Sequence, residues 1–381
     1  MRLGQLSSYP LSRRRLLGGA LGLGASAGLL GLSGCALSER STLNWGNWTY
    51  YLDYDNEQQL YPTLEDFMST TGIDVQYLED IDDANTFYGT IKDALKLEQD
   101  TGYDTFCVGD TLILRLLDSG VLQEFNHANM PNLSQLLPRL QNSSYDPNLA
   151  HSIPWQTGMT GLCYNTKLYP RGVESVQDLM RSDLRGRVGV LSVMSNTVGL
   201  IMLSQGVDIS AEWGENEFQN AIEYLDANID SGQIAQVKGN SYTQDLQTGD
   251  LLAGMCWSGD IAMLNDEAGE EVWKFVVPEA GASYFVDSFV VPSGSTKREE
   301  VEQLIDFYYD PEVAARVADY VRYVTPVAGA REAMERVNPS LVDDQLVFPT
   351  EEMSERLYEF RPLSRSEDRE FEAAFAKVMG L

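Results

Sequence analysis

The stretch LNWGNWTYYLDYDNEQQLYPTLEDFMSTTGIDVQYL, residues 43–78, decides the fold. Its first five residues, 43–47, read as a strand. Apolar residues then recur at helical spacing, at Leu60, Leu64, Phe67 and Met68. Thr70, Thr71 and Gly72 end this helix, and residues 73–78 form a second strand. A strand, a helix and a strand in this order indicate layered α/β structure.

The same alternation continues along the chain. The pattern predicts helices at 86–97, 197–204 and 218–226, and mostly helix after residue 291. It predicts further strands at 103–108, 153–155, 161–165, 188–191, 251–257, 272–277 and 285–291. Because 381 residues exceed what one hydrophobic core usually serves, we expect two lobes, each a mixed sheet flanked by helices.

The charge of the chain restricts its partners. There are 57 acidic and 27 basic residues, which gives a formal net charge of −30. Phosphate binding requires clustered Lys and Arg, so this balance argues against nucleic acid as a partner. An acidic surface favours cationic ligands, although it also suits a protein from a salty habitat.

The chain shows little sign of catalytic or metal chemistry. It contains neither the HExxH metalloprotease pattern nor the GxxxxGK[ST] phosphate loop, and His127 and His151 are isolated. There is no CxxC pair and no histidine cluster, which argues against a zinc or redox site. We therefore expect a protein without enzymatic activity, metal or cofactor.

The N-terminal segment has the features of an export signal. Three arginines, Arg13, Arg14 and Arg15, precede an apolar run over residues 16–32 that is interrupted by glycines. This arrangement resembles a twin-arginine signal, and Leu32-Ser33-Gly34-Cys35 resembles a bacterial lipobox. The resemblance implies removal of residues 1–34 and a lipid anchor on Cys35. A plain transmembrane anchor is the alternative, but the run is short for one.

Three more cysteines lie in apolar stretches that read as buried strands, namely Cys107, Cys163 and Cys256. Buried cysteines mostly act as small hydrophobic residues, and we favour that interpretation. A Cys163–Cys256 disulfide is also compatible with the sequence and stays open.

Aromatic residues and carboxylates gather at the ends of predicted strands. The stretches are Asn47-Trp48-Thr49-Tyr50-Tyr51, Met255-Cys256-Trp257-Ser258-Gly259-Asp260 and Tyr284-Phe285-Val286-Asp287-Ser288. Ligands of open α/β sheets bind beyond the carboxyl ends of the strands. Rings that face a ligand cation contribute about 0.5–2 kcal/mol each, and a carboxylate fixes the cation's position. Each ring alone is more often part of a core, but their joint placement favours a site for a cation.

These stretches also resemble the bacterial spermidine/putrescine-binding proteins, a family of extracellular solute receptors of ABC importers. The similarity begins at residues 45–60 and continues through Tyr103-Asp104 and residues 118–123. It extends to Ser152-Ile153-Pro154-Trp155, Gly158, residues 161–165 and 255–259, Val286-Asp287-Ser288 and Tyr323-Val324-Thr325-Pro326. The order and spacing of these motifs cover nearly all of the chain after Cys35.

The resemblance implies a two-lobed periplasmic-binding-protein fold of type II, hinged between its lobes. The first lobe is expected at 42–152 and 287–331, and the second at 153–286 and 332–381. A polyamine would lie between them and would be delivered to the permease subunits of the importer. The residues implied to bind it are Trp48, Thr49, Tyr51, Trp257, Phe285, Asp287 and Tyr323. Asp287 would anchor an ammonium, and Trp257 would stack on the alkyl chain. We expect a monomer outside the cytoplasm, anchored to the membrane.

Several positions depart from the family pattern. Tyr50 stands where the family often has an anchoring Glu, and residues 192–197 replace its acidic anchors. Gly109 and Thr111 replace a Ser and a Tyr, and Arg361 falls near a family Gln, where a cation would repel a diamine. An unpaired ammonium in a closed cleft costs several kcal/mol, so lost carboxylates need compensation. Asp53, Asp55 and Asp110 are the candidates.

Three alternatives follow from these departures. The same clamp could hold a neutral or zwitterionic solute, with Arg361 pairing a carboxylate. It could instead serve a signalling receptor that presents its closed form to a sensor protein. A lipid-anchored hydrolase is the third, and the sequence offers no pair of nucleophile and base to support it.

Overall fold

The structure is a computed structural model that describes residues 42–143 and 145–380. The predicted signal and Cys35 therefore lie outside the described residues. Within these ranges, no helix combines the length and the apolar character that crossing a bilayer requires. Expected elements fall close to observed ones, although residues 153–155 and 161–165 belong to one continuous strand, β4 (Ile153–Asn165).

The strands form one mixed sheet in the order β2-β1-β3-β9-β4-β7-β5-β6, with β10 beside β9 and β8 beside β4. Their bounds are β1 Thr42–Trp48, β2 Asp74–Ile81, β3 Thr105–Gly109, β4 Ile153–Asn165, β5 Val188–Leu191, β6 Ile234–Lys238, β7 Ala253–Trp257, β8 Trp273–Val276, β9 Ala282–Val290 and β10 Leu357–Glu359. The sequence pattern missed the short strands β6 and β10, because β6 is only half-buried and β10 has three residues.

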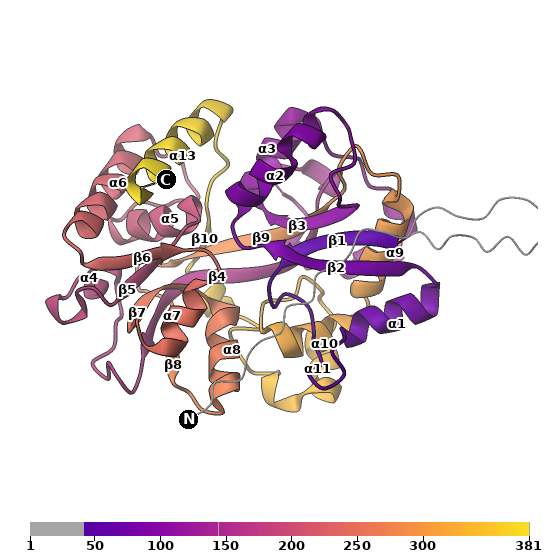
Figure 1. Cartoon of the computed structure of the whole chain (residues 1–381). Helices are drawn as coiled ribbons and strands as arrows, with labels where there is room; N and C mark the ends of the chain where they lie inside the picture. Colours follow the sequence, from indigo (N-terminus) through magenta and orange to yellow (C-terminus); the bar gives the residue numbers. More distant parts are fainter. Residues whose placement is uncertain (1–41, 144, 381) are drawn as a thin grey trace, which may run out of the picture. The chain divides into compact units, whose positions relative to one another are not determined.

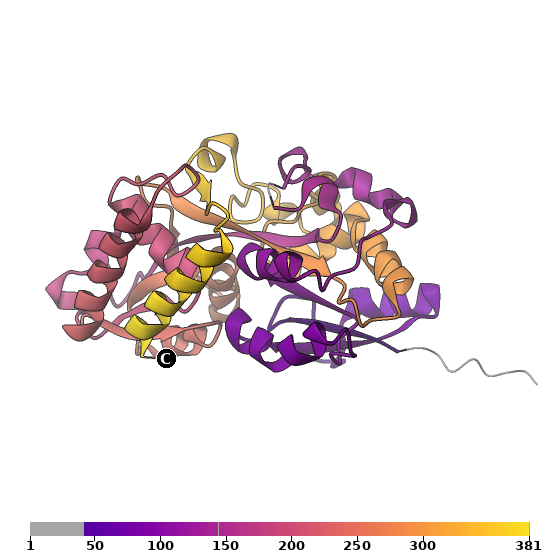
Figure 2. The same cartoon turned by 90° about the horizontal axis from the view of Figure 1, so that it is seen from above.

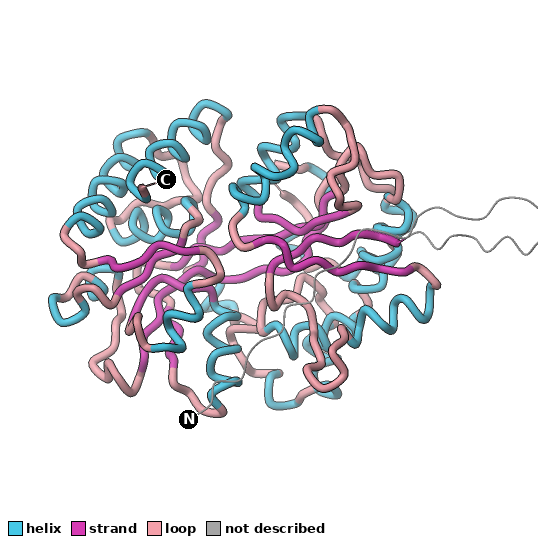
Figure 3. Tube along the Cα trace, viewed as in Figure 1, coloured by secondary structure: helices cyan, strands magenta, loops and turns pink. Residues whose placement is uncertain are grey.

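Helices cover both faces of the sheet (Figure 3). Their bounds are α1 Pro62–Thr71, α2 Ala84–Lys96, α3 Asp110–Ser119, α4 Val176–Leu179, α5 Met194–Ser204, α6 Glu215–Asp230, α7 Tyr242–Thr248, α8 Ser258–Ala268, α9 Arg298–Tyr308, α10 Pro311–Val321, α11 Ala330–Val337, α12 Glu351–Ser354 and α13 Arg365–Met379. Short 3-10 turns fill the loop between α3 and β4.

Two long antiparallel strands, β4 and β9, join two groups of elements (Figures 1 and 2). We call the group with β1 to β3, α1 to α3 and α9 to α11 the first lobe. The group with β5 to β8, α4 to α8 and α13 is the second lobe. The C-terminal end of β9 pairs with β3, whereas the C-terminal end of β4 pairs with β7 and β8. Each long strand therefore belongs to both lobes.

Each lobe has its own aromatic packing. In the first lobe, Trp45 is fully buried and its ring lies 5.1 Å from Trp155 and 5.3 Å from Phe289. In the second lobe, Phe371 of α13 stacks on Phe218 of α6 with ring centroids 4.0 Å apart. Burying one such side chain contributes about 1.5–3 kcal/mol, so these clusters fix the strands on either side of the long pair.

The three other cysteines agree with the interpretation that they act as small buried hydrophobic residues. Cys107, Cys163 and Cys256 are buried free thiols in β3, β4 and β7. Burial raises the pKa of the Cys256 thiol, and its neighbour Cys163 adds to the effect. The two thiols lie on paired strands, but the structure has no disulfide between them.

Candidate functional site

A cavity of about 90 Å³ lies between the lobes, beyond the carboxyl ends of β1, β3, β5, β6 and β7. This volume is several times the 10–15 Å³ that one water requires, so the cavity has room for a small solute. It is lined by Trp48, Thr49, Tyr51, Ala84, Gly109, Asp110, Thr111, Leu112, Val193, Ser195, Asn196, Asn240, Trp257, Asp260, Phe285, Asp287 and Tyr323.

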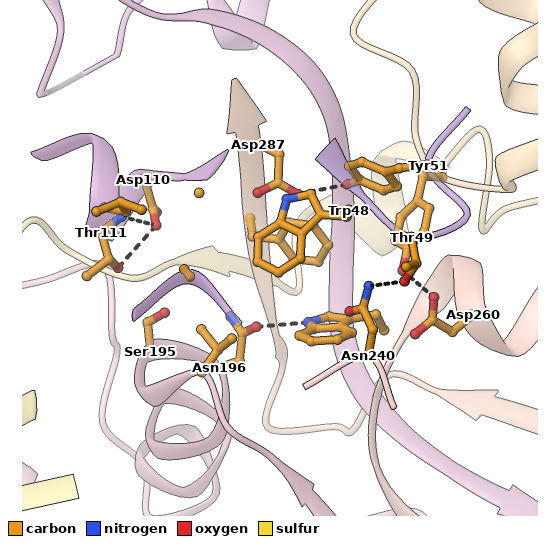
Figure 4. A pocket seen from close by; sticks show the side chains of 17 residues that line it. Trp48, Thr49, Tyr51, Asp110, Thr111, Ser195, Asn196, Asn240, Asp260 and Asp287 are labelled. Carbon is orange, nitrogen blue, oxygen red and sulfur yellow. Dashed lines mark hydrogen bonds between the residues drawn. The ribbon is translucent and has the colours of Figure 1, made fainter. Parts of the chain in front are cut away.

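All seven residues that the sequence predicted for the site line this cavity (Figure 4). Trp48, Thr49 and Tyr51 come from the end of β1 and the loop after it. Trp257 ends β7 and precedes α8. Phe285 and Asp287 lie on β9, and Tyr323 follows α10. Residues up to 275 positions apart, from Trp48 to Tyr323, therefore meet around one space. Their role in binding remains a prediction.

Asp287 is a buried carboxylate at the back of the cavity. Its Oδ2 accepts a hydrogen bond of 2.8 Å from the Tyr51 hydroxyl, which comes from the first lobe (Figure 4). Burial raises the pKa of Asp287 to about 7, the Tyr51 hydrogen bond opposes this rise, and the nearby Asp110 charge adds to it. Among the described residues that line the cavity, none is a cation that could pair with Asp287.

Asp260 is a second such carboxyl, in the first turn of α8. Its Oδ1 accepts a hydrogen bond of 2.8 Å from the Tyr323 hydroxyl. Its Oδ2 is buried and has no hydrogen-bond partner in the structure. Burial raises the pKa of Asp260 to about 6, and the hydroxyls of Tyr323 and Tyr242 both oppose this rise. A charged donor from a bound molecule would stabilise this carboxylate further.

Asp110 is the third carboxyl of the cavity. It is the first residue of α3, and Gly109 occupies the N-cap. Its Oδ1 accepts from the Thr111 backbone N–H at 2.7 Å, and burial raises its pKa to about 6. The positive end of the helix dipole favours a carboxylate at this position, but burial has the larger effect.

The other two acids considered as compensation lie elsewhere. Asp53 is buried, and its Oδ2 accepts a hydrogen bond of 3.0 Å from the backbone N–H of Thr63. It does not line the cavity. Asp55 accepts from the backbone of Gln58 at 2.9 Å in an exposed turn. Of the three candidates, only Asp110 faces the cavity.

Aromatic rings form much of the remaining wall. The rings of Tyr51 and Tyr323 meet edge to face with centroids 5.1 Å apart, and Phe285 lies 6.2 Å from Tyr323. The indole Nε1 of Trp257 donates to Asn196 Oδ1 at 2.9 Å, which fixes the orientation of that ring. The Nε1 of Trp48 is buried and has no acceptor in the structure.

Two glycines allow the rings to approach the backbone this closely. A Cβ on Gly259 would lie 2.3 Å from the Tyr323 ring. A Cβ on Gly158 would lie 2.5 Å from the ring of Phe285. Both distances are far below van der Waals contact. The two rings can therefore occupy these positions only because Gly259 and Gly158 have no side chain.

The positions that depart from the family pattern differ in whether they reach the cavity. Tyr50 lies outside the cavity and is 58% exposed, with its backbone at φ 60°. Ser195 and Asn196 line the cavity at the start of α5, where they supply amide and hydroxyl groups. Arg361 does not line the cavity. Its guanidinium pairs with Glu367 at 2.6 Å and stacks 4.0 Å above Trp213. The expectation that Arg361 faces the ligand is therefore wrong.

Sequence reasoning missed several lining residues. Asp260 was visible in the strand-end motif but received no role, because acids at helix starts usually cap or stabilise the helix. Asn240, whose Nδ2 donates to Thr49 Oγ1 at 3.2 Å across the lobes, follows the strand β6 that the pattern did not predict. A search for polar residues within three positions of each predicted strand end would have found Asp260 but not Asn240, because β6 was not predicted.

The cavity therefore combines three carboxyls with aromatic walls. No Lys, Arg or His is among its lining residues. Such a surface complements a small organic cation.

Comparison with known proteins agrees with this reading. Residues 63–347 match the model of the family described as bacterial extracellular solute-binding protein. The chain belongs to this family. The expected periplasmic-binding-protein fold is confirmed, and members of the family are binding components, not enzymes.

Characterised relatives of this solute-binding protein match along most of its length. The spermidine/putrescine-binding periplasmic protein of Escherichia coli is 26% identical over 342 residues, covering 90% of each chain. The putrescine-binding periplasmic protein PotF of the same organism is 24% identical, covering 94% of this chain and 96% of its own. The structure of the PotD substrate-binding protein from Streptococcus pneumoniae superposes with a TM-score of 0.70 at 22% identity, covering 88% of this chain and 98% of its own.

The glycine contacts lead to a test of the site's construction. We expect Gly259→Ala to destabilise the protein by about 1–3 kcal/mol, because the added methyl group displaces the Tyr323 ring and its bond to Asp260. Gly89→Ala is the matched control, since Gly89 lies within α2 with open space around it, and should stabilise by about 0.4–1 kcal/mol. Urea unfolding measures both. Equal stability of the two variants would show that the close approach is not needed.

Proposed function

We propose that this protein is the solute receptor of an ABC importer and that it binds a polyamine of the putrescine and spermidine class. The observation that carries the proposal is the convergence of Asp110, Asp260 and Asp287 on one cavity without a basic side chain. A linear diamine or triamine supplies the missing positive charges at separated points. The relatives named for binding these compounds support the same ligand class.

In this proposal, Asp287 and Asp260 anchor two ammonium groups. Asp287 accepts from Tyr51 through one oxygen, and the other oxygen remains for an ammonium. Asp260 has one buried oxygen without a partner. Charge-assisted hydrogen bonds to carboxylates are about twice as strong as neutral ones. Asp110 lies close enough to raise the pKa of Asp287, so a cation between them relieves repulsion as well.

The rings would enclose the carbon chain and the charges between the anchors. Trp257 stacks on the alkyl chain with its N–H already bonded to Asn196. Trp48, Tyr51, Phe285 and Tyr323 present further faces and edges, and cation–π attraction grows as water is excluded. Thr49 contributes through its bond to Asn240, which joins the lobes at the rim of the cavity.

We further propose that the lobes close on the ligand by bending where the chain crosses between them. Two crossings fall in β4 after residue 152 and in β9 near residues 286 and 287, as the strand pairing of these segments suggests. The third was expected at residues 331 and 332, inside α11. Because α11 packs on α10 of the first lobe, we place this crossing later, between residue 341 and β10. Such hinge closure is a known response of two-lobed receptors.

The closed receptor would deliver its ligand, as a monomer outside the cytoplasm, to permease subunits in the membrane. The curated relatives are periplasmic proteins. Twin-arginine export and a lipid on Cys35 would keep this receptor beside its permease.

The lipid anchor predicts a simple fractionation result. Wild-type protein should sediment with membranes, whereas Cys35→Ser should remain in the soluble extracytoplasmic fraction, because it lacks the thiol that carries the lipid. A Cys107→Ser control should behave as wild type, since that thiol is buried in β3. Membrane retention of the Cys35→Ser protein would favour a transmembrane anchor.

A second ligand class is favoured by one observation. Trp48 lines the cavity, and its buried Nε1 has no hydrogen-bond acceptor in the structure. A solute that joins an ammonium to a carbonyl or carboxylate oxygen would satisfy it. N-acetylated polyamines and amino acids therefore belong in the same binding panel as putrescine and spermidine.

Calorimetry tests the ligand and the anchor together. Wild-type protein should bind putrescine or spermidine, and Asp287→Asn should weaken binding at least about tenfold by removing a charge-assisted bond. Asp53→Asn is the matched control, because Asp53 is a buried acid outside the cavity, and it should leave affinity unchanged. Unchanged affinity of Asp287→Asn would refute the anchor, and absence of binding to either polyamine by wild type would refute the ligand class.

The pH dependence of binding follows from the raised pKa values. The pKa is about 6 for Asp110 and Asp260 and about 7 for Asp287. At a pH near or below these values, each carboxyl must release a proton before it can bind an ammonium. Affinity should therefore be high at pH 8 and fall as pH decreases through 7, by up to about tenfold per unit for each proton released. Asp287→Asn should flatten the profile. An affinity that is constant between pH 5.5 and 8 would contradict the charged anchors.

A further inference from the structure

The C-terminal helix α13 belongs to the second lobe but lies beside α2 and α3 of the first lobe (Figure 2). Phe371 fixes α13 in the second lobe by stacking on Phe218 of α6, with an interplanar angle of 13°. A neighbouring strip of α13 carries Asp368 and Glu372, and Arg365 lies at the start of the helix. These three charged side chains all contact the first lobe.

Arg115 of α3 makes the central contact. Its Nε lies 3.2 Å from Asp368 Oδ2 and its Nη2 lies 3.2 Å from Asp368 Oδ1, so the guanidinium binds the carboxylate with two parallel hydrogen bonds. Its Nη1 donates to Asn85 Oδ1 at 2.9 Å, and the Tyr88 ring lies 5.5 Å below its Cζ. Asn85 and Tyr88 belong to the first lobe, so they hold Arg115 ready for its partner.

Two further contacts run parallel to this pair. Asn85 Nδ2 donates to Glu372 Oε2 at 3.2 Å, and Arg365 Nε lies 2.6 Å from Asp118 Oδ2. Arg115 Nη2 also lies 4.0 Å from Glu372 Oε1, but burial raises the pKa of Glu372 to about 7, so this group is only partly ionised at neutral pH. Arg365 and Asp118 are mostly exposed, and such pairs contribute little. Arg115 and Asp368, with side chains about one-fifth exposed, are the stronger charged pair.

The position of Arg115 links this contact to the cavity. Asp110 and Thr111, which line the cavity, also line the adjoining space that contains Arg115 and Asp368. Arg115 lies one helical turn after Thr111 on α3. The contact can form only when α13 and α3 are this close, which is the arrangement that encloses the cavity.

From this geometry we propose that Arg115 is a positioning residue whose two-bond pair with Asp368 of α13 latches the lobes together. The latch stabilises the closed form around a bound solute and slows its release, without touching it. The inference rests on the proposed function only in assuming that a solute enters this cavity. Because the pair bridges two lobes, its absence changes the opening equilibrium and leaves each lobe intact.

Kinetics of polyamine release test the latch. Spermidine dissociation, followed by stopped-flow tryptophan fluorescence, should become about three- to tenfold faster in Arg115→Gln, with the association rate unchanged. Asp368→Asn should give the same acceleration, and adding it to Arg115→Gln should add little, because both break one pair. Arg316→Gln is the matched control, since its 2.7 Å pair with Asp66 lies within the first lobe. Its release rate should equal that of wild type.

The outcomes separate the latch from the proposed ligand. Unchanged dissociation in Arg115→Gln, or fully additive effects of the two substitutions, would overturn the latch. If wild type binds neither putrescine nor spermidine, the proposed ligand class fails, and small-angle scattering of the ligand-free protein tests the latch instead. In that case Arg115→Gln should have a larger radius of gyration than wild type at low salt, and the difference should vanish at 0.5 M NaCl, where the Debye length is only a few ångströms. Equal radii at low salt would refute it.

Discussion

Three carboxyls face one small cavity, and none of the described residues that line it is a Lys, Arg or His. This arrangement is the constraint on which the rest of the site depends. Burial raises the pKa of Asp110 and Asp260 to about 6 and that of Asp287 to about 7, and the Asp110 charge adds to the rise in Asp287. Ionising these buried carboxyls is costly, and in the proposed function a positively charged solute would offset that cost. Tyrosine hydroxyls on Asp260 and Asp287 stabilise the acids in part and also fix where their free oxygens point.

The fold determines which lobe supplies each part of the site. Strands β4 and β9 belong to both lobes, and β9 carries Phe285 and Asp287 at the place where it passes from one to the other. Tyr51 and Asp287 both belong to the first lobe, where Asp287 pairs with Gly109 of β3, whereas Tyr323 of the first lobe bonds to Asp260 of α8 in the second lobe. The Arg115–Asp368 pair lies outside the cavity and acts on the same equilibrium. Solute charge and surface charge thus stabilise one closed arrangement through separate contacts.

Part of this organisation was predictable from the sequence. Trp48 and Trp257 could be placed because each ends a strand, where α/β sheets bind ligands, whereas Phe285 lies inside β9 and not at the strand end that the sequence suggested. Asp260 escaped, since an acid in the first turn of a helix has an ordinary structural explanation. Arg361 was placed wrongly, because only the folded chain brings Trp213 and Glu367 to its guanidinium. Contacts between lobes, such as that of α13 with α3, depend on tertiary packing and leave no local pattern.

The most direct measurement is a crystal structure of the protein with bound spermidine. The account predicts one ammonium nitrogen within hydrogen-bond distance of Asp287 and another beside the Oδ2 of Asp260, which has no partner here. The alkyl chain should lie against Trp257, with Arg361 still bonded to Glu367. A ligand that leaves both aspartates without a cation, or that binds outside this cavity, would contradict the account.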